Sequence, residues 1–321
     1  MTRTSWFDGH LNFARTHWRS LSVSLLVALS PQVSAQSEEG KRRTFFAELE
    51  AGAEYDSVVS LDELDLSADT GDQALLIDAS VGVEQPLGSG VELDLRYTYS
   101  VLDYQDISEV DQNSHILSGD LKKKLGGADI GLSGFYVNAD LDDESFLELA
   151  RVSPYVSGFF TKGWFARTGY VYSDKSNDVN PGRDATASIG EIDIYHFPPG
   201  KPWFFNIGYK YRDEDASAAR FDYTGDTFKA RWVQRMTLWD RKARFELGFR
   251  RLDRDYSSVT PSIGEKRFDQ RDRTQVQLEV ALTERLDLEF YYNYSDWESN
   301  LESVDFHQHV AGFRFRYRWE S

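Results

Sequence analysis

Residues 313–319 read FRFRYRW, a strict alternation of aromatic and arginine side chains. Side chains on a β-strand point to opposite faces at a period of two, so the rings share one face and the arginines share the other. Such a strand needs an apolar environment on one side and a polar environment on the other.

The same alternation recurs along most of the chain. Residues 91–101 read VELDLRYTYSV, in which valine, leucine and tyrosine occupy the odd-numbered positions and polar residues occupy the even-numbered ones. Residues 203–212 and 286–294 repeat the pattern. Counted over the whole sequence, such segments of about 10 to 15 residues predict about 14 strands.

The connections between these segments alternate in length. Short turns such as PLGSG (86–90) follow one strand, and longer acidic loops such as SLDELDLSADTG (60–71) follow the next. This regular alternation indicates a series of antiparallel hairpins.

Strand length separates two architectures that use such hairpins. Strands of soluble proteins are about five or six residues long, whereas a tilted strand that crosses a membrane needs about 9 to 11. In a bilayer the sheet must close, because every backbone polar group must be paired; apolar residues then face lipid and polar residues face the lumen. The sequence therefore predicts an all-β fold, a transmembrane antiparallel up-and-down β-barrel of about 14 strands, with a soluble β-sandwich or barrel as the alternative.

The N-terminus has the pattern of an export signal. Three arginines precede the apolar run LSVSLLVAL (21–29), and a small-residue site ends at Ala35. The run is shorter than the roughly 18 residues of a membrane-spanning helix. We predict a cleaved signal peptide at residues 1–35, a short periplasmic segment at 36–42, and the barrel at 43–319.

Composition excludes several classes of function. The net charge of -17 argues against a nucleic-acid partner, because binding to phosphates needs a basic surface. The absence of cysteine excludes disulfides and thiolate metal sites. The acidic segment ADLDDE (139–144) lacks the ligand spacing of a calcium-binding loop, so we expect no metal and no cofactor.

The sequence does not predict an enzyme. Ser114 and His115 are adjacent, and His307 and His309 lie near acidic residues, but none of them belongs to a nucleophile motif of diagnostic spacing. We expect these histidines to lie at the membrane interface or in loops.

In its alternating strands and its aromatic last strand, the barrel segment resembles Gram-negative outer-membrane β-barrel proteins. Its strand number is similar to that of monomeric porins with about 14 strands. The resemblance implies an outer-membrane location, with lipid and lipopolysaccharide as surroundings. It also implies that the last strand carries the signal read by the barrel-assembly machinery. The residues of that signal would be Phe313, Phe315, Tyr317 and Trp319. The closing hairpin, residues 291–319, is similar to the last hairpin of the barrels in surface-lipoprotein assembly modifiers.

The polar faces predict two charged walls inside the barrel. The acidic wall comprises Glu48, Glu50, Glu54, Asp78, Glu92 and Asp94. The basic wall comprises Lys210, Arg212, Lys229, Arg231, Arg235, Arg244 and Arg250. The walls lie about half a barrel apart, which resembles the transverse field of general porins; the alternative is local pairing between neighbouring strands. Arg314, Arg316 and Arg318 are predicted to pair with the acidic first strand at the barrel seam.

A barrel of about 14 strands has a backbone diameter of roughly 28 Å. We therefore predict a passive porin-like channel for small hydrophilic solutes. The alternative, based on the closing hairpin, is a partner-dependent barrel for surface-lipoprotein or polysaccharide export and assembly.

Overall fold

The computed structural model describes residues 43–68 and 70–321. The predicted signal peptide (1–35) and periplasmic segment (36–42) lie outside the described residues. The first strand begins at Thr44 and the last ends at Glu320.

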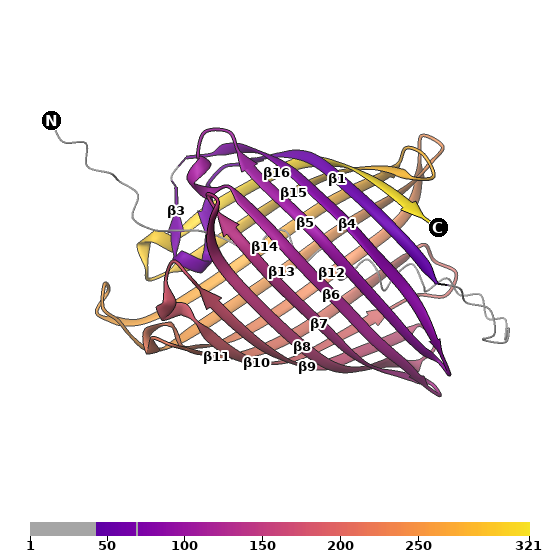
Figure 1. Cartoon of the computed structure of the whole chain (residues 1–321), viewed down its shortest axis with the longest axis horizontal. Helices are drawn as coiled ribbons and strands as arrows, with labels where there is room; N and C mark the ends of the chain where they lie inside the picture. Colours follow the sequence, from indigo (N-terminus) through magenta and orange to yellow (C-terminus); the bar gives the residue numbers. More distant parts are fainter. Residues whose placement is uncertain (1–42, 69) are drawn as a thin grey trace.

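Fourteen strands form one closed antiparallel barrel (Figure 1). The barrel strands are β1 (Thr44–Asp56), β4 (Asp72–Gly88), β5 (Val91–Tyr104), β6 (Gln112–Leu125), β7 (Ala128–Leu141), β8 (Glu144–Thr161), β9 (Trp164–Asn177), β10 (Ala185–His196), β11 (Trp203–Ala216), β12 (Tyr223–Leu238), β13 (Arg241–Thr260), β14 (Glu265–Ala281), β15 (Leu286–Ser299) and β16 (Phe306–Glu320). Each strand pairs with its neighbours in the chain, and β1 pairs with β16 to close the sheet. The predicted fold class and strand number are confirmed.

The remaining elements of the described chain lie in the loops. Strands β2 (Ser60–Leu61) and β3 (Leu66–Ser67) form a separate two-stranded sheet. The short 3₁₀ helices are η1 (Asp62–Leu64), η2 (Ser108–Val110), η3 (Pro181–Arg183), η4 (Ala219–Phe221) and η5 (Glu302–Val304). Within residues 43–68 and 70–321, no helix has the length and apolar character needed to cross a membrane.

The outer surface of the barrel is apolar. In β16, the side chains of Phe313, Phe315 and Trp319 are exposed, whereas Arg314 between them is buried. The same alternation exposes Leu95 on β5 and Phe290 on β15. Exposed rings and leucines around a closed sheet match the outward-facing apolar band of a barrel that contacts lipid.

The two ends of the barrel differ, as Figure 1 shows. At one end most of the turns have two residues, as at 89–90, 126–127 and 239–240. At the other end, the end where β3 lies, most connections are longer. Two connections at this end are short: the acidic segment 139–144 contains only the two-residue turn 142–143, and residues 261–264 join β13 to β14. Backbone pairing continues through these segments because a β-ladder needs no apolar face to persist.

Candidate functional site

The long loop between β1 and β4, residues 57–71, folds into the barrel. Its helix η1 carries Asp62 and Glu63, which reach cations on two well-separated strands of the wall. Arg271 on β14 donates to Asp62 at 2.9 Å, and Lys175 on β9 donates to Glu63 at 3.0 Å. The loop therefore spans the lumen from one wall to another. We call residues 57–71 the inward loop.

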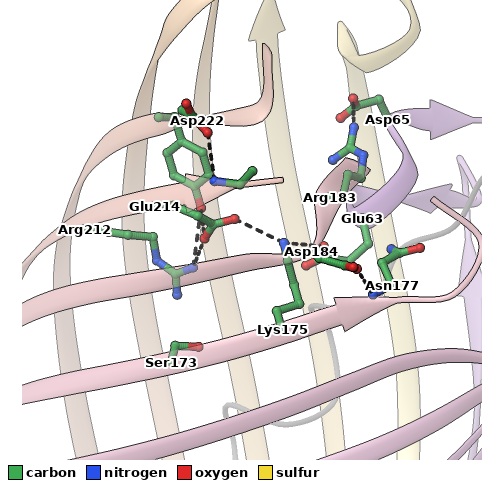
Figure 2. Close-up of polar contacts among 12 residues, drawn as sticks. Glu63, Asp65, Ser173, Lys175, Asn177, Arg183, Asp184, Arg212, Glu214 and Asp222 are labelled. Atoms are coloured by element: carbon green, nitrogen blue, oxygen red, sulfur yellow. Dashed lines mark hydrogen bonds and ion pairs between the residues drawn. The ribbon is translucent and has the colours of Figure 1, made fainter. Parts of the chain in front are cut away.

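Asp65, which follows η1, provides a third anchor for the inward loop. Its carboxylate pairs with Arg267 on β14 at 2.7 Å and with Arg183 of η3. Figure 2 shows Asp65 beside Arg183, and Glu63 close to Lys175, which also reaches Glu214 on β11. These carboxylates and cations are mostly buried, so both partners of each pair are needed to offset desolvation.

Apolar residues hold the same loop against the lumen wall. Leu61 and Leu64 pack in one buried cluster with Ile116, Val137 and Leu147 of β6, β7 and β8. A second cluster joins Val59 to residues of β4 and β5. Lumen-facing positions of a channel are normally polar. This apolar patch is explained by the inward loop, which packs against it.

Acidification is expected to loosen the inward loop. Burial alone would raise the pKa of the Glu63 carboxyl, but the charge and hydrogen bond of Lys175 outweigh burial and hold that pKa below its ordinary value of 4.5. A carboxyl with a lowered pKa stabilises docking above its ordinary pKa, and this contribution is lost as the pH falls through the lowered value. Amide hydrogen exchange of residues 57–71, corrected for the intrinsic pH dependence, should be faster at pH 3 than at pH 7.

The control for this prediction is Glu63→Gln, which cannot titrate. Its inward loop should exchange faster than the natural loop already at pH 7, and should change less between the two pH values. Equal protection of the natural loop at both pH values would contradict the prediction.

The acidic wall meets the predicted seam where β1 pairs with β16. Register places Glu48 opposite Arg318 and Glu50 opposite Arg316. The side chains follow this register: Arg318 donates to Glu48 at 2.6 Å, and Arg316 donates to Glu50 at 2.7 Å. Arg314 lies 3.8 Å from both Glu50 and Asp78, counted between charged atoms.

The other acidic-wall residues have different neighbours. Glu54 accepts a hydrogen bond from the Tyr291 hydroxyl at 2.7 Å, and Gly312, which has no side chain, is its register partner on β16. Glu92 pairs with Lys122 at 3.0 Å. Asp94 lies in register with Asp120 on β6 and with another carboxylate on β4.

Most of the basic wall is paired with carboxylates on the same strand or on strands one or two positions away. The ion pairs are Lys210 with Glu191 at 3.7 Å, Arg212 with Glu214 at 2.5 Å, Lys229 with Asp193 at 2.8 Å, Arg231 with Glu246 at 3.6 Å, and Arg244 with Glu246 at 2.7 Å. Arg250 lines the central cavity, and Arg235 is exposed near the turn between β12 and β13. Local pairing thus neutralises much of both walls.

A cavity of about 360 Å³ lies inside the barrel along β7 to β13. The inward loop contributes Asp62 and Glu63 to its lining, and Phe165, Tyr195 and Phe197 line it as well. The basic lining residues are Arg151, Arg167, Lys175, Arg183, Lys210, Arg212, Lys229, Arg250 and Arg254, and the acidic ones are Asp62, Glu63, Glu191, Asp193 and Glu214. Nine cationic and five anionic side chains give this cavity a basic character.

Comparison with known proteins connects this geometry to solved barrels. No protein-family model matches the chain, and no curated protein matches it significantly. Among solved structures, the chain is similar to the trimer form of OmpT, an outer membrane protein of Vibrio cholerae, with a TM-score of 0.52 and 11% identity over 87% of this chain and 99% of that one. An anion-selective porin from Comamonas acidovorans gives a TM-score of 0.51 and 8% identity over 87% of this chain and 99% of that one. The chain has the fold of a porin-like outer-membrane β-barrel.

His115, His307 and His309 lie on the outer face of this porin-like barrel. His115 stacks on Tyr97, whose hydroxyl is 2.7 Å from the imidazole, while Ser114 is buried on the lumen side. The two residues therefore point to opposite faces of β6. His307 lies 2.7 Å from Asp296 on β15 and stacks on the half-buried Tyr294.

Sequence reasoning missed two parts of the porin-like barrel's interior. The sequence assigns residues 60–71 only to a longer acidic loop, and it assigns Arg151 and Arg254 to no site. One signal was available for the loop: Leu61 and Leu64 alternate with its carboxylates, whereas the acidic segment 139–144 contains a single leucine. Apolar residues within a charged loop indicate that it packs against something.

Proposed function

We propose that this chain is a passive channel of the Gram-negative outer membrane that admits small hydrophilic solutes. One observation carries the proposal: a closed barrel with an apolar exterior encloses a cavity lined by charged side chains. Water-filled lumens of this kind let polar solutes cross lipid without energy coupling. The inward loop narrows the path at the end of the barrel where β3 lies.

The outer surface supports the membrane part of this proposal. The rings of Phe313, Phe315, Tyr317 and Trp319 form a continuous exposed row on β16, the strand that closes the barrel. We propose that this row is the signal for the barrel-assembly machinery, and that lipid and lipopolysaccharide surround the apolar belt. Arg314, Arg316 and Arg318 on the opposite face secure the closure with β1.

Single-channel recording in planar bilayers tests the function. Folded protein should give stepwise increases of current in potassium chloride, and heat-denatured protein from the same preparation should give none. If folded protein inserts into the bilayer but gives no conductance, the proposed channel function is refuted. The partner-dependent alternative would then be tested by measuring the surface exposure of lipoproteins in a strain lacking this protein.

A further inference from the structure

The central cavity is basic although the protein is acidic. The full chain has a net charge of -17, whereas the cavity lining has four more cationic than anionic side chains. Cations have therefore been concentrated in one part of the lumen. Because a permeating solute must pass this lining, its charge should complement it.

The carboxylates of the cavity are already engaged by some of these cations. Glu214 binds both Lys175 and Arg212, at 3.1 and 2.5 Å, and accepts a third hydrogen bond from Tyr223. Asp193 is held by Lys229 at 2.8 Å. Few carboxylate oxygens are left to neutralise the other arginines of the cavity.

Two arginines of the cavity lack a carboxylate partner within residues 43–68 and 70–321. Arg151 on β8 contacts the Ser173 hydroxyl at 3.4 Å, and Arg254 on β13 lies over the Tyr223 ring at 5.2 Å, but neither has a carboxylate oxygen within 4.0 Å among these residues. The Nε atom of Arg254 is buried and, in the same part of the chain, has no hydrogen-bond acceptor. Carboxylates act on the two guanidinium groups only from beyond 4.0 Å, Asp62 and Asp269 on Arg254 and Glu63 and Glu214 on Arg151. An anion from solution would supply the direct ion pair that both half-buried groups lack.

Arg212 on β11 lies between Arg151 on β8 and Arg254 on β13 in the order of the strands. It interacts electrostatically with Arg151 across the strands β9 and β10, and with Arg254 across β12. The residue of β12 in register between Arg212 and Arg254 is Gly225, which has no side chain to separate them. The cavity thus presents guanidinium groups from β8, β11 and β13 to one space.

We infer that this cavity binds the oxyanion group, carboxylate or phosphate, of a small organic acid at Arg151 and Arg254. The planar fork of a guanidinium suits both groups, since it can donate two parallel hydrogen bonds to their oxygens. Arg212, fixed by Glu214 and Tyr223, adds positive charge beside the site. This inference rests on the proposed channel and names its solute class: anions pass or bind in preference to cations and neutral solutes.

The test combines ion selectivity with competition by two probes, succinate and inorganic phosphate. In a potassium chloride gradient the natural barrel should prefer chloride, and either probe should reduce the chloride current. The double variant Arg151→Gln, Arg254→Gln should shift the reversal potential towards cation preference. It should also raise the half-blocking probe concentration roughly tenfold or more, because charge-assisted hydrogen bonds are lost.

A matched control removes the same charge elsewhere. Lys201→Gln, Lys242→Gln neutralises two exposed lysines at the short-turn end, and should leave block by succinate and phosphate unchanged. Block by only one of the two probes would identify the oxyanion that the site accepts. A channel that conducts but prefers potassium, or a double variant of Arg151 and Arg254 that retains natural selectivity and block, would overturn the inference while leaving the channel intact.

Absence of conductance would instead refute the proposed function, and binding then decides the inference separately. Calorimetric titration of succinate and of phosphate into the folded barrel in detergent should show saturable binding that the double variant lacks. If neither probe binds, the oxyanion site is refuted. The retained heat-dependent mobility of each variant in gel electrophoresis shows that the barrel is folded.

Discussion

Replacing residues 59–68 with a short glycine-serine linker is expected to raise the single-channel conductance roughly two- to fourfold, because a constriction inside a wide lumen dominates its resistance. The replaced segment includes η1, which reaches Arg271 on one side of the lumen and Lys175 on the other. Without it, the lumen at that end is limited by the barrel wall. The same change exposes the four cations that bind the loop carboxylates in the natural protein, so preference for anions should also increase.

Two comparison variants separate narrowing of the path from a general effect of altered loops. Replacing residues 261–263, the exposed tip between β13 and β14, with the same linker should leave conductance unchanged. The triple variant Asp62→Asn, Glu63→Gln, Asp65→Asn keeps the inward loop but removes its ion pairs. Because Leu61 and Leu64 still pack on the wall, its current should fluctuate between the low and high levels.

A folded linker variant with the natural conductance would contradict this expectation. It would show that the inward loop does not limit the current through the barrel. The current would then be limited by side chains deeper in the lumen, and the cavity lined by Arg151 and Arg254 would be the next segment to enlarge.

The fold follows from the sequence because two physical constraints act on every strand. Lipid requires apolar side chains on one face, and the lumen tolerates polar ones on the other, so a period of two assigns each residue to a face. Closure then makes the first and last strands neighbours. This is why the arginines of the last strand could be expected to lie beside the carboxylates of the first. The individual partners, Glu48 with Arg318 and Glu50 with Arg316, come from the register of the structure.

The inward loop could not be predicted in the same way. Its ion pairs join residues distant in the sequence, such as Asp62 and Arg271, and no local periodicity records such a contact. Strand ends were also predicted too short, because β13 and β14 continue pairing beyond the alternating segment and past a bulge between Asp255 and Val259. The cavity arginines were overlooked for a related reason: Arg151 lies in a strand whose alternation is irregular.

Replacing Arg316 with alanine is expected to lower the free energy of unfolding by about 3 to 5 kcal/mol, the cost typical of removing one partner from a buried ion pair. Arg316 joins three carboxylates: Glu50 across the seam at 2.7 Å, Glu279 at 2.9 Å and Glu289 at 3.7 Å. Its own side chain is 15% exposed and that of Glu289 is 8% exposed. Without Arg316, Glu50 and Glu279 would keep only more distant cations, Arg314 and Arg244, each at 3.8 Å. Three carboxylates would then remain close together in a space that water reaches poorly. Urea unfolding of the folded barrel in lipid vesicles measures the loss.

Arg318→Ala is the matched control, because it removes the same side chain type from the same face of β16. Arg318 is 35% exposed, and its partner Glu48 keeps a second cation, Arg96, at 3.7 Å. We therefore expect a loss of at most about 1 kcal/mol, in the range of exposed pairs. The exchange Glu50→Arg, Arg316→Glu should recover only part of the stability, because it restores the seam contact but adds a carboxylate beside Glu279 and Glu289. Equal losses for Arg316→Ala and Arg318→Ala would show that the stability of the seam comes from backbone pairing alone, and that the three-carboxylate network around Arg316 contributes nothing beyond an ordinary surface ion pair.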